Sequence, residues 1–119
     1  MRKFVIGRLK GIKYSLKGAW ILLKTEASIQ VQFVIAVAIT ILGFIFKIST
    51  GEWMAQFVSI ALVMSAEGLN TAIEDIADFI HPDYHDKIGR IKDIAAGAVG
   101  IAALIAVIIA GFIYIPKVF

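Results

Sequence analysis

Three long stretches without a charged side chain constrain this chain more than any other feature. We expect membrane-spanning helices within residues 28–46, 53–78 and 94–115, the second of which carries no charge before Glu67. A helix needs about 20 apolar residues to cross the roughly 30 Å hydrocarbon core of a bilayer. With 60% hydrophobic and only 18% charged residues, the composition indicates an all-α integral membrane protein, not a soluble helical bundle.

The length of 119 residues indicates a single membrane-embedded domain, residues 1–119. A chain this short has little core of its own, so association with further copies is expected. No cysteine is present, so no disulfide is involved. Pro116, which cannot donate a helix hydrogen bond, and Lys117 are expected to end the third span.

Residues 1–27 precede the first span and have the pattern of an amphipathic surface helix. Their basic residues alternate with apolar ones and no small-residue cleavage site follows, which distinguishes them from a signal peptide. Helical spacing collects one set of residues on a basic face (Lys10, Lys13, Lys17 and Lys24) and another on an apolar face (Leu9, Ile12, Leu16 and Leu23). Such a helix lies in the membrane interface with its lysines against anionic head groups.

The distribution of Lys and Arg predicts the orientation of the chain. Seven precede the first span and three follow the second, against one in the loop between the first two spans and one in the C-terminal tail. Because basic loops remain on the cytoplasmic side, the N-terminus and the second loop are expected there.

Four polar residues of the stretch EGLNTAIEDIAD recur at helical spacing within the second span: Glu67, Asn70, Glu74 and Asp78. A rotation of 100° per residue places them within about 80° of one another on one helix face, and Glu67 lies roughly 10 Å deeper than Glu74. A single acidic residue near a helix end is commonly a solvated cap. A row of intramembrane polar groups usually faces a functional site, and carboxylates are ligands for Mg²⁺.

The second loop, within HPDYHDKIGRIKDIAAGA, supplies complementary chemistry. Arg90 and Lys92 can neutralise phosphate, although the positive-inside rule alone also explains them, and Asp93 can orient phosphate or cap the third helix. His81 and His85 have the spacing of helical metal ligands but no third ligand of that type, so we expect no zinc site. Together with the four polar residues, the loop predicts a metal-nucleotide site at the cytoplasmic membrane surface.

The segments YSLKGAWILLKTEASIQ, EGLNTAIEDIAD and GRIKDIAAGAV resemble the prokaryotic diacylglycerol kinase and undecaprenol kinase family over nearly the whole chain. The resemblance implies a homotrimer of three-span subunits, each preceded by a surface helix, in the bacterial cytoplasmic (inner) membrane. It implies an ATP-dependent lipid kinase that transfers the γ-phosphoryl group of MgATP to the hydroxyl of diacylglycerol or undecaprenol. No nucleic-acid partner is expected.

Residue by residue, the resemblance makes Glu67 the general base, and Glu26 and Glu74 the ligands of Mg²⁺. It implies nucleotide-binding positions at Tyr14, Ser15, Asn70, Asp78, His85, Gly89, Lys92 and Asp93. The sequence departs from some members at Gln30, where they have a basic residue, and at Gln32, where they have an acidic one. Which lipid is preferred, and how subunits share a site, stay open.

Two other classes of protein would explain part of the pattern. A non-catalytic membrane assembly or regulatory subunit would not need Glu67, Asn70 and Glu74 in register. A proton or cation pathway would use intramembrane carboxylates, but the polar row stops halfway and the first and third spans have no ionisable partner.

Overall fold

Four helices account for almost all of the chain in the computed structural model, which describes residues 1–119. They are α1 (Arg2–Thr25), α2 (Ala27–Ile45), α3 (Thr50–Ile80) and α4 (Asp86–Val118). The last three are each long and apolar enough to cross a membrane. The expected all-helical fold with three helices able to span a membrane is therefore confirmed, and the expected spans 28–46, 53–78 and 94–115 lie within α2, α3 and α4 apart from one residue.

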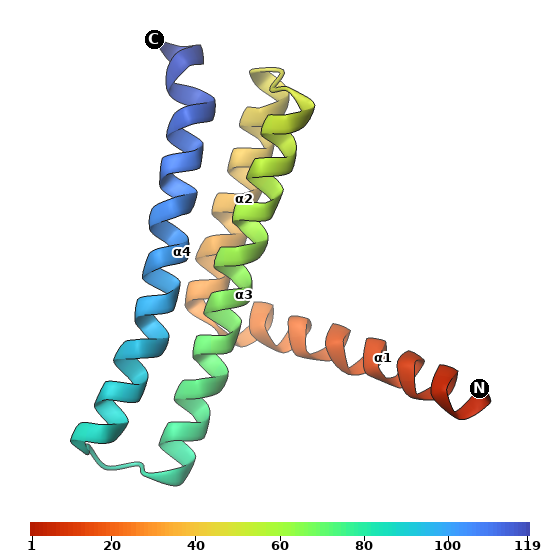
Figure 1. Ribbon diagram of the computed structural model, residues 1–119, viewed down its shortest axis with the longest axis vertical. Coiled ribbons are helices and arrows are strands. Elements are labelled where there is room, and N and C mark those ends of the chain that lie inside the picture. The colour runs from red at the N-terminus through yellow and green to blue at the C-terminus, as the bar shows by residue number, and fades with distance from the viewer.

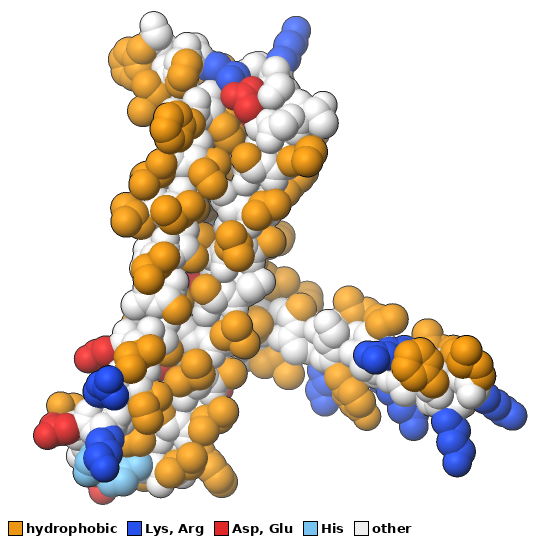
Figure 2. All heavy atoms as spheres, in the orientation of Figure 1, with side chains coloured by type: hydrophobic (Ala, Val, Ile, Leu, Met, Phe, Trp, Pro, Cys, Tyr) orange, Lys and Arg blue, Asp and Glu red, His pale blue; other side chains and the backbone are white.

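The last three helices run side by side as a bundle, whereas α1 projects from it at a steep angle (Figure 1). Contacts between α3 and α4 are the most extensive, those between α2 and α3 are fewer, and α1 contacts mainly α2. We call the two ends of the bundle the Glu52 end, at the α2–α3 connection, and the His81 end, at the α3–α4 connection. Charged side chains gather at both ends and the surface between them is largely apolar (Figure 2).

Helix α3 begins three residues earlier than expected because Ser49 and Glu52 form a capping box. The Ser49 hydroxyl accepts from the Glu52 amide at 3.2 Å, and the Glu52 carboxylate accepts from the Ser49 amide at 2.9 Å. These bonds satisfy backbone donors that an α-helix leaves free at its start. Lys47, at φ 51°, reverses the chain just before this cap.

Helix α4 begins eight residues earlier than expected, so most of the predicted second loop is helical. His85 caps it, its Nδ1 accepting from the Lys87 amide at 3.1 Å, and the expectation that Asp93 caps this helix is wrong. At the other end the expectation that Pro116 stops the helix is also wrong. The helix continues to Val118 because a proline in the last turn removes only one hydrogen bond, and the Phe119 amide still donates to the Ile115 carbonyl.

A single residue, Glu26, separates α1 from α2. Its extended backbone (φ −101°, ψ 114°) ends α1, and its carbonyl accepts the first hydrogen bond of α2 from the Gln30 amide. Beyond this joint α1 leaves the bundle at the level of Gly68, where the methyl of Leu22 approaches so closely that a Cβ on Gly68 would lie 3.0 Å from it. The last three turns of α3 extend past the joint and run beside α4 (Figure 1).

Candidate functional site

Helix α3 carries the predicted polar row, which we call the α3 stripe (Glu67, Asn70, Glu74 and Asp78). Glu67, Asn70 and Glu74 are half-buried, whereas Asp75, on another face, is exposed. The Asn70 amide donates to Glu74 Oε1 at 3.3 Å, and the Asn70 carbonyl oxygen is buried without a partner. A buried polar atom without a partner is costly, so this oxygen is suited to an additional ligand.

The far end of the stripe is tied to α4. Lys92 Nζ lies 2.5 Å from Asp78 Oδ1, and both side chains are partly exposed. Lys92 precedes the uncharged stretch of α4, and its hydrogen bond to Asp78 raises its pKa, so the ammonium stays charged at neutral pH. The structure therefore pairs two residues that the sequence assigned separately to the nucleotide. Asp93 is exposed and forms no side-chain hydrogen bond.

Glu26 lies at the joint between α1 and α2. Its carboxylate is half-buried and makes no hydrogen bond, either as a cap of α2 or to another side chain. The contact between Leu22 and Gly68 brings this joint against α3 beside Glu67. The structure thus places Glu26 and Glu67 at the same level of the bundle, with Glu74 two helical turns further toward the His81 end.

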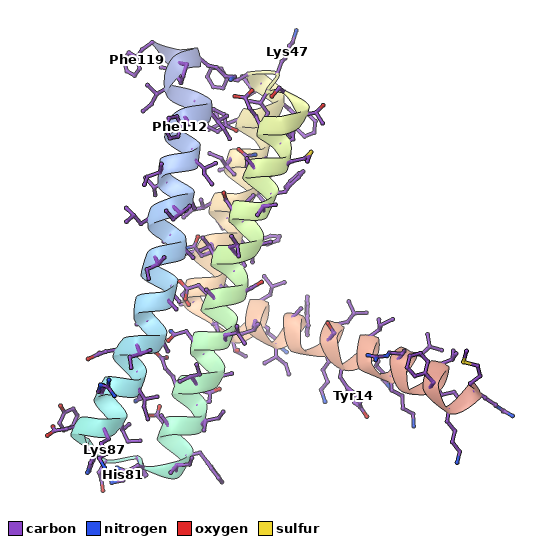
Figure 3. The ribbon with its side chains drawn as sticks, viewed as in Figure 1. Tyr14, Lys47, His81, Lys87, Phe112 and Phe119 are labelled. Atoms are coloured by element: carbon purple, nitrogen blue, oxygen red, sulfur yellow. The ribbon has the colours of Figure 1, made fainter.

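Other predicted nucleotide residues lie on different elements. His85 caps α4 and Gly89 lies in its first turn, where the Tyr84 ring covers Gly89 so closely that an added Cβ would lie 3.3 Å from it. Tyr14 and Ser15 are exposed on α1, and Tyr14 projects from the middle of that helix (Figure 3). Within one chain they do not approach the α3 stripe.

Oxygen atoms near the α3 stripe are candidate ligands for Mg²⁺. No three His, Cys, Asp or Glu side chains gather closely enough in the chain to hold a metal by themselves. Magnesium is usually held by one or two carboxylates together with substrate phosphates and water. The Glu74 carboxylate beside the unpartnered Asn70 oxygen, with Glu26 at the joint, fits that mode, because all of these are hard oxygen donors.

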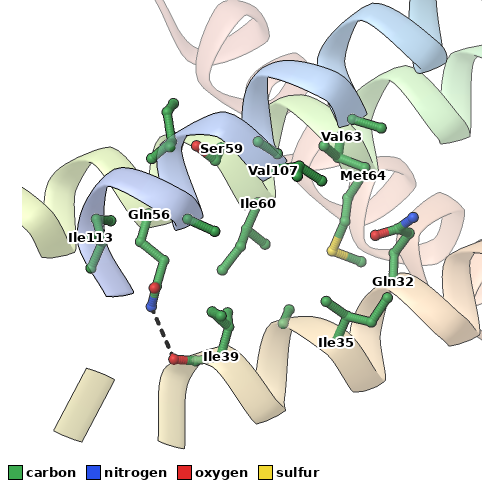
Figure 4. Close-up of a pocket in the computed structure, with 15 residues that line it drawn as sticks. Gln32, Ile35, Ile39, Gln56, Ser59, Ile60, Val63, Met64, Val107 and Ile113 are labelled. Atoms are coloured by element: carbon green, nitrogen blue, oxygen red, sulfur yellow. Dashed lines mark hydrogen bonds between the residues drawn. The ribbon is translucent and has the colours of Figure 1, made fainter. Parts of the chain in front are cut away.

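An apolar cavity of about 240 Å³ lies between α2, α3 and α4 and reaches the neighbourhood of Glu67. Twelve of its 15 lining residues are hydrophobic. Gln32 and Met64 lie at one end of it, and at the other Gln56 donates to the Ile39 carbonyl (Figure 4). Met64 is three residues before Glu67, so the cavity ends about one helical turn from that residue.

Sequence reasoning missed what Gln30 and Gln32 do. Gln32 lines the apolar cavity. The side-chain amide of Gln30 bridges the joint and donates to the carbonyls of Leu23 at 3.1 Å and Lys24 at 3.2 Å. An amide side chain within one turn after a helix break was the available signal, because the last carbonyls of a helix lack partners.

This chain is similar in sequence to known proteins. The profile of the family described as prokaryotic diacylglycerol kinase matches residues 13–114. The undecaprenol kinase of Bacillus subtilis (strain 168) is 39% identical over 108 residues, which cover 91% of this chain and 88% of the relative. The diacylglycerol kinase of Escherichia coli (strain K12) is 35% identical over 103 residues, covering 84% and 82%. The diacylglycerol kinase of Haemophilus influenzae is 32% identical over 103 residues, covering 87% of each. The chain therefore belongs to the prokaryotic diacylglycerol kinase family and is a lipid kinase.

Proposed function

We propose that this lipid kinase transfers the γ-phosphoryl group of MgATP to the hydroxyl of diacylglycerol or undecaprenol at the cytoplasmic face of the bacterial inner membrane. The observation that carries the proposal is the level at which α1 leaves the bundle. If α1 lies in the membrane interface, the contact of Leu22 with Gly68 places Glu67 at the depth of lipid head groups. Glu74 then lies about 10 Å further out, in reach of a nucleotide from the cytosol.

The position of α1 in the interface is itself part of the proposal. Several Lys and Arg side chains lie on the side of α1 that faces the His81 end (Figure 2). Basic side chains on that side would contact anionic head groups while apolar ones enter the acyl region. Both this helix and the α3–α4 connection are then cytoplasmic.

Glu67 is the residue that accepts the proton in this mechanism. The lipid hydroxyl oxygen attacks the γ-phosphorus, the bond from phosphorus to the bridging oxygen of ADP breaks, and the hydroxyl proton passes to Glu67. No partner in the chain competes for that carboxylate, so it is free to accept the hydroxyl proton. Phosphoryl transfer needs little else from a protein than positioning and charge neutralisation.

Residues on α3 and α4 would hold the nucleotide. Glu26 and Glu74 would hold Mg²⁺, which neutralises charge on the phosphates when it is bound. The unpartnered Asn70 oxygen would bind the metal or one of its waters. Lys92, held by Asp78, would direct its remaining N–H donors at phosphate, and Asp93, His85 and Gly89 line the same end of the bundle. Tyr14 and Ser15 would contact nucleotide only if α1 of a further copy approaches.

The cavity between α2, α3 and α4 would hold hydrocarbon of the acceptor lipid. Its apolar lining matches an acyl or prenyl chain, and Met64 at its end is one helical turn from Glu67, so the attached hydroxyl would reach that carboxylate. Gln32 in its wall is neutral, which suits a hydrocarbon better than a carboxylate would.

We propose that the enzyme is a homotrimer. Only 10 of the 119 residues are buried in the single chain, so large apolar faces remain for lipid or for further copies. Mass measurement of the detergent complex, corrected for bound detergent, checks this, and a monomeric active species would exclude it.

The activity is tested with purified protein in mixed micelles and ATP labelled at the γ-phosphorus. Labelled product should appear in extracted lipid, and parallel rates on diacylglycerol and undecaprenol identify the preferred acceptor. Absence of labelled lipid with both acceptors would refute the proposal.

Orientation is tested separately with single cysteines, which is simple because the chain has none of its own. In intact cells a membrane-impermeant reagent should label a cysteine at position 52 and not one at position 24. The reverse pattern would contradict the proposed topology.

A further inference from the structure

The joint at Glu26 connects two long helices through one residue. Rotation about φ and ψ of Glu26 would change the angle between α1 and α2, and it would also turn the Glu26 carboxylate relative to α3. Holding this carboxylate in place therefore requires contacts that cross the joint.

Gln30 makes such contacts from the first turn of α2. Its side-chain nitrogen donates to two carbonyls of the last turn of α1, those of Leu23 and Lys24. Both belong to the four carbonyls that a helix leaves without an internal partner. The neighbouring Leu22 carbonyl accepts from the Glu26 amide, and the Thr25 hydroxyl donates to the Ile21 carbonyl at 2.7 Å without leaving α1. Among these side chains, only Gln30 links the two helices.

We infer that Gln30 is a positioning residue that fixes the joint and thereby the Glu26 carboxylate. Its backbone strengthens the case, because the Gln30 amide donates to the Glu26 carbonyl while its side chain holds α1. The adjacent Ile29 is buried, at 2% exposure, so the first turn of α2 is anchored in the structure. The Gln30 side chain thus extends from a fixed point to the movable helix.

This inference rests on the proposed role of Glu26 in binding Mg²⁺, and it predicts a specific kinetic effect. Without the link, the carboxylate samples more orientations, so it loses more conformational entropy when it binds the metal. Half-maximal binding then needs a higher Mg²⁺ concentration. The chemical step, which depends on Glu67 on a different helix, should be unaffected once Mg²⁺ is saturating.

The test uses Gln30→Met, which keeps the length of the side chain and removes its donors. We expect the Mg²⁺ concentration for half-maximal rate to rise about tenfold, the lower limit of what losing an outer-shell partner costs a metal site. The Kd for Mn²⁺, measured without turnover from the EPR signal of free Mn²⁺ in the presence of ADP, should rise by about the same factor. The kcat at saturating Mg²⁺ and the KM for lipid should stay near those of the unchanged enzyme.

Thr25→Val is the matched control, because it removes a hydrogen bond from the same end of α1 that does not cross the joint. It should leave the Mg²⁺ dependence unchanged. An unchanged Mg²⁺ requirement in Gln30→Met, or an equal rise in Thr25→Val, would each overturn the inference.

Glu26→Gln separates failure of this inference from failure of the proposed metal site. If Glu26→Gln shifts the Mg²⁺ dependence and Gln30→Met does not, only the positioning role is wrong. If neither shifts it, Glu26 does not bind the metal and the proposed site is wrong as well.

Discussion

The two ends of the bundle differ in how their polar groups are used. At the Glu52 end each buried polar group has a partner in the chain: Glu52 pairs with Lys117 at 2.7 Å, and the Tyr114 hydroxyl donates to Gln56 Oε1 at 2.6 Å. In the half of the bundle toward the His81 end, the carboxylates of Glu26 and Glu67 have no partner, and the Asn70 oxygen is buried without one. Polar groups that satisfy one another hold helices together, whereas groups left unsatisfied are available to substrates.

The apolar packing differs in the same direction. The Trp53 ring lies over Gly43 and is flanked by Phe44 and Phe57, with ring centroids 4.9 and 5.4 Å away. No aromatic pair of this kind packs α3 against its neighbours near Glu67. The Glu52 end is thus the more closely packed part of the structure, and substitutions there should affect stability and not chemistry.

The largest effect should come from Glu67→Gln. The amide keeps the size of the side chain and removes the base, so the rate should fall by roughly 10² to 10⁴ while nucleotide affinity is retained. Labelled lipid measures the rate, and nucleotide titration measures the affinity. Asp75→Asn, on the exposed face of the same helix, is the control and should keep full activity. Near-normal activity in Glu67→Gln would show that this carboxylate is not the base.

Glu74→Gln should have the next largest effect. A neutral amide is a poor ligand for a hard dication, so the Mg²⁺ requirement should rise by roughly 10- to 100-fold, or turnover should stop. Rates across a Mg²⁺ titration measure this. Asp83→Asn, in the exposed α3–α4 connection, removes an equal charge and should leave the titration unchanged. An unaltered requirement in Glu74→Gln would remove Glu74 from the metal site.

Gly43→Ala tests the close packing at the Glu52 end. A Cβ at this position would lie 2.5 Å from the Trp53 ring, and overpacking of this kind costs about 1–3 kcal/mol of unfolding free energy. Unfolding in mixed SDS and detergent micelles measures the loss, and kcat per folded enzyme should be unchanged. Gly51→Ala, at the same end with its nearest atom 4.0 Å away, should cost much less. If Gly43→Ala altered the KM for ATP or lipid, packing at the Glu52 end would also control substrate binding, which contradicts the comparison.

The smallest effect is expected for Tyr114→Phe. The change leaves Gln56 Oε1 without its donor, which should lower the free energy of unfolding by about 1 kcal/mol. The same unfolding assay detects it, with Tyr84→Phe on the exposed connection as control. A fall in kcat without a fall in stability would mean that this hydrogen bond acts on the chemistry after all.

The sequence predicted the parts of the fold that depend on periodicity and charge. Uncharged length identified the three spans, and helical spacing placed Glu67, Asn70 and Glu74 on one face of α3. The starts of α3 and α4 were placed too late because Ser49 and His85 cap them through local hydrogen bonds that hydropathy does not register. The pairing of Asp78 with Lys92 was missed for another reason: it depends on how α3 packs against α4.

The candidate site was predictable to a lesser extent. Carboxylates and their spacing are visible in the sequence, and the family resemblance suggested their roles. Three other features follow from three-dimensional packing: the level of Glu26 beside Gly68, the cavity that ends at Met64 and the link made by Gln30.

Because α1 joins α2 through a single residue, a small rotation at Glu26 produces a large displacement at the far end of α1. Its 24 residues extend about 36 Å, so a rotation of 10° at Glu26 displaces the far end of the helix by about 6 Å. The same rotation moves atoms next to the pivot by only a fraction of an ångström. A spectroscopic label near Arg2 would therefore amplify movements at Glu26 that are too small to detect at the carboxylate itself.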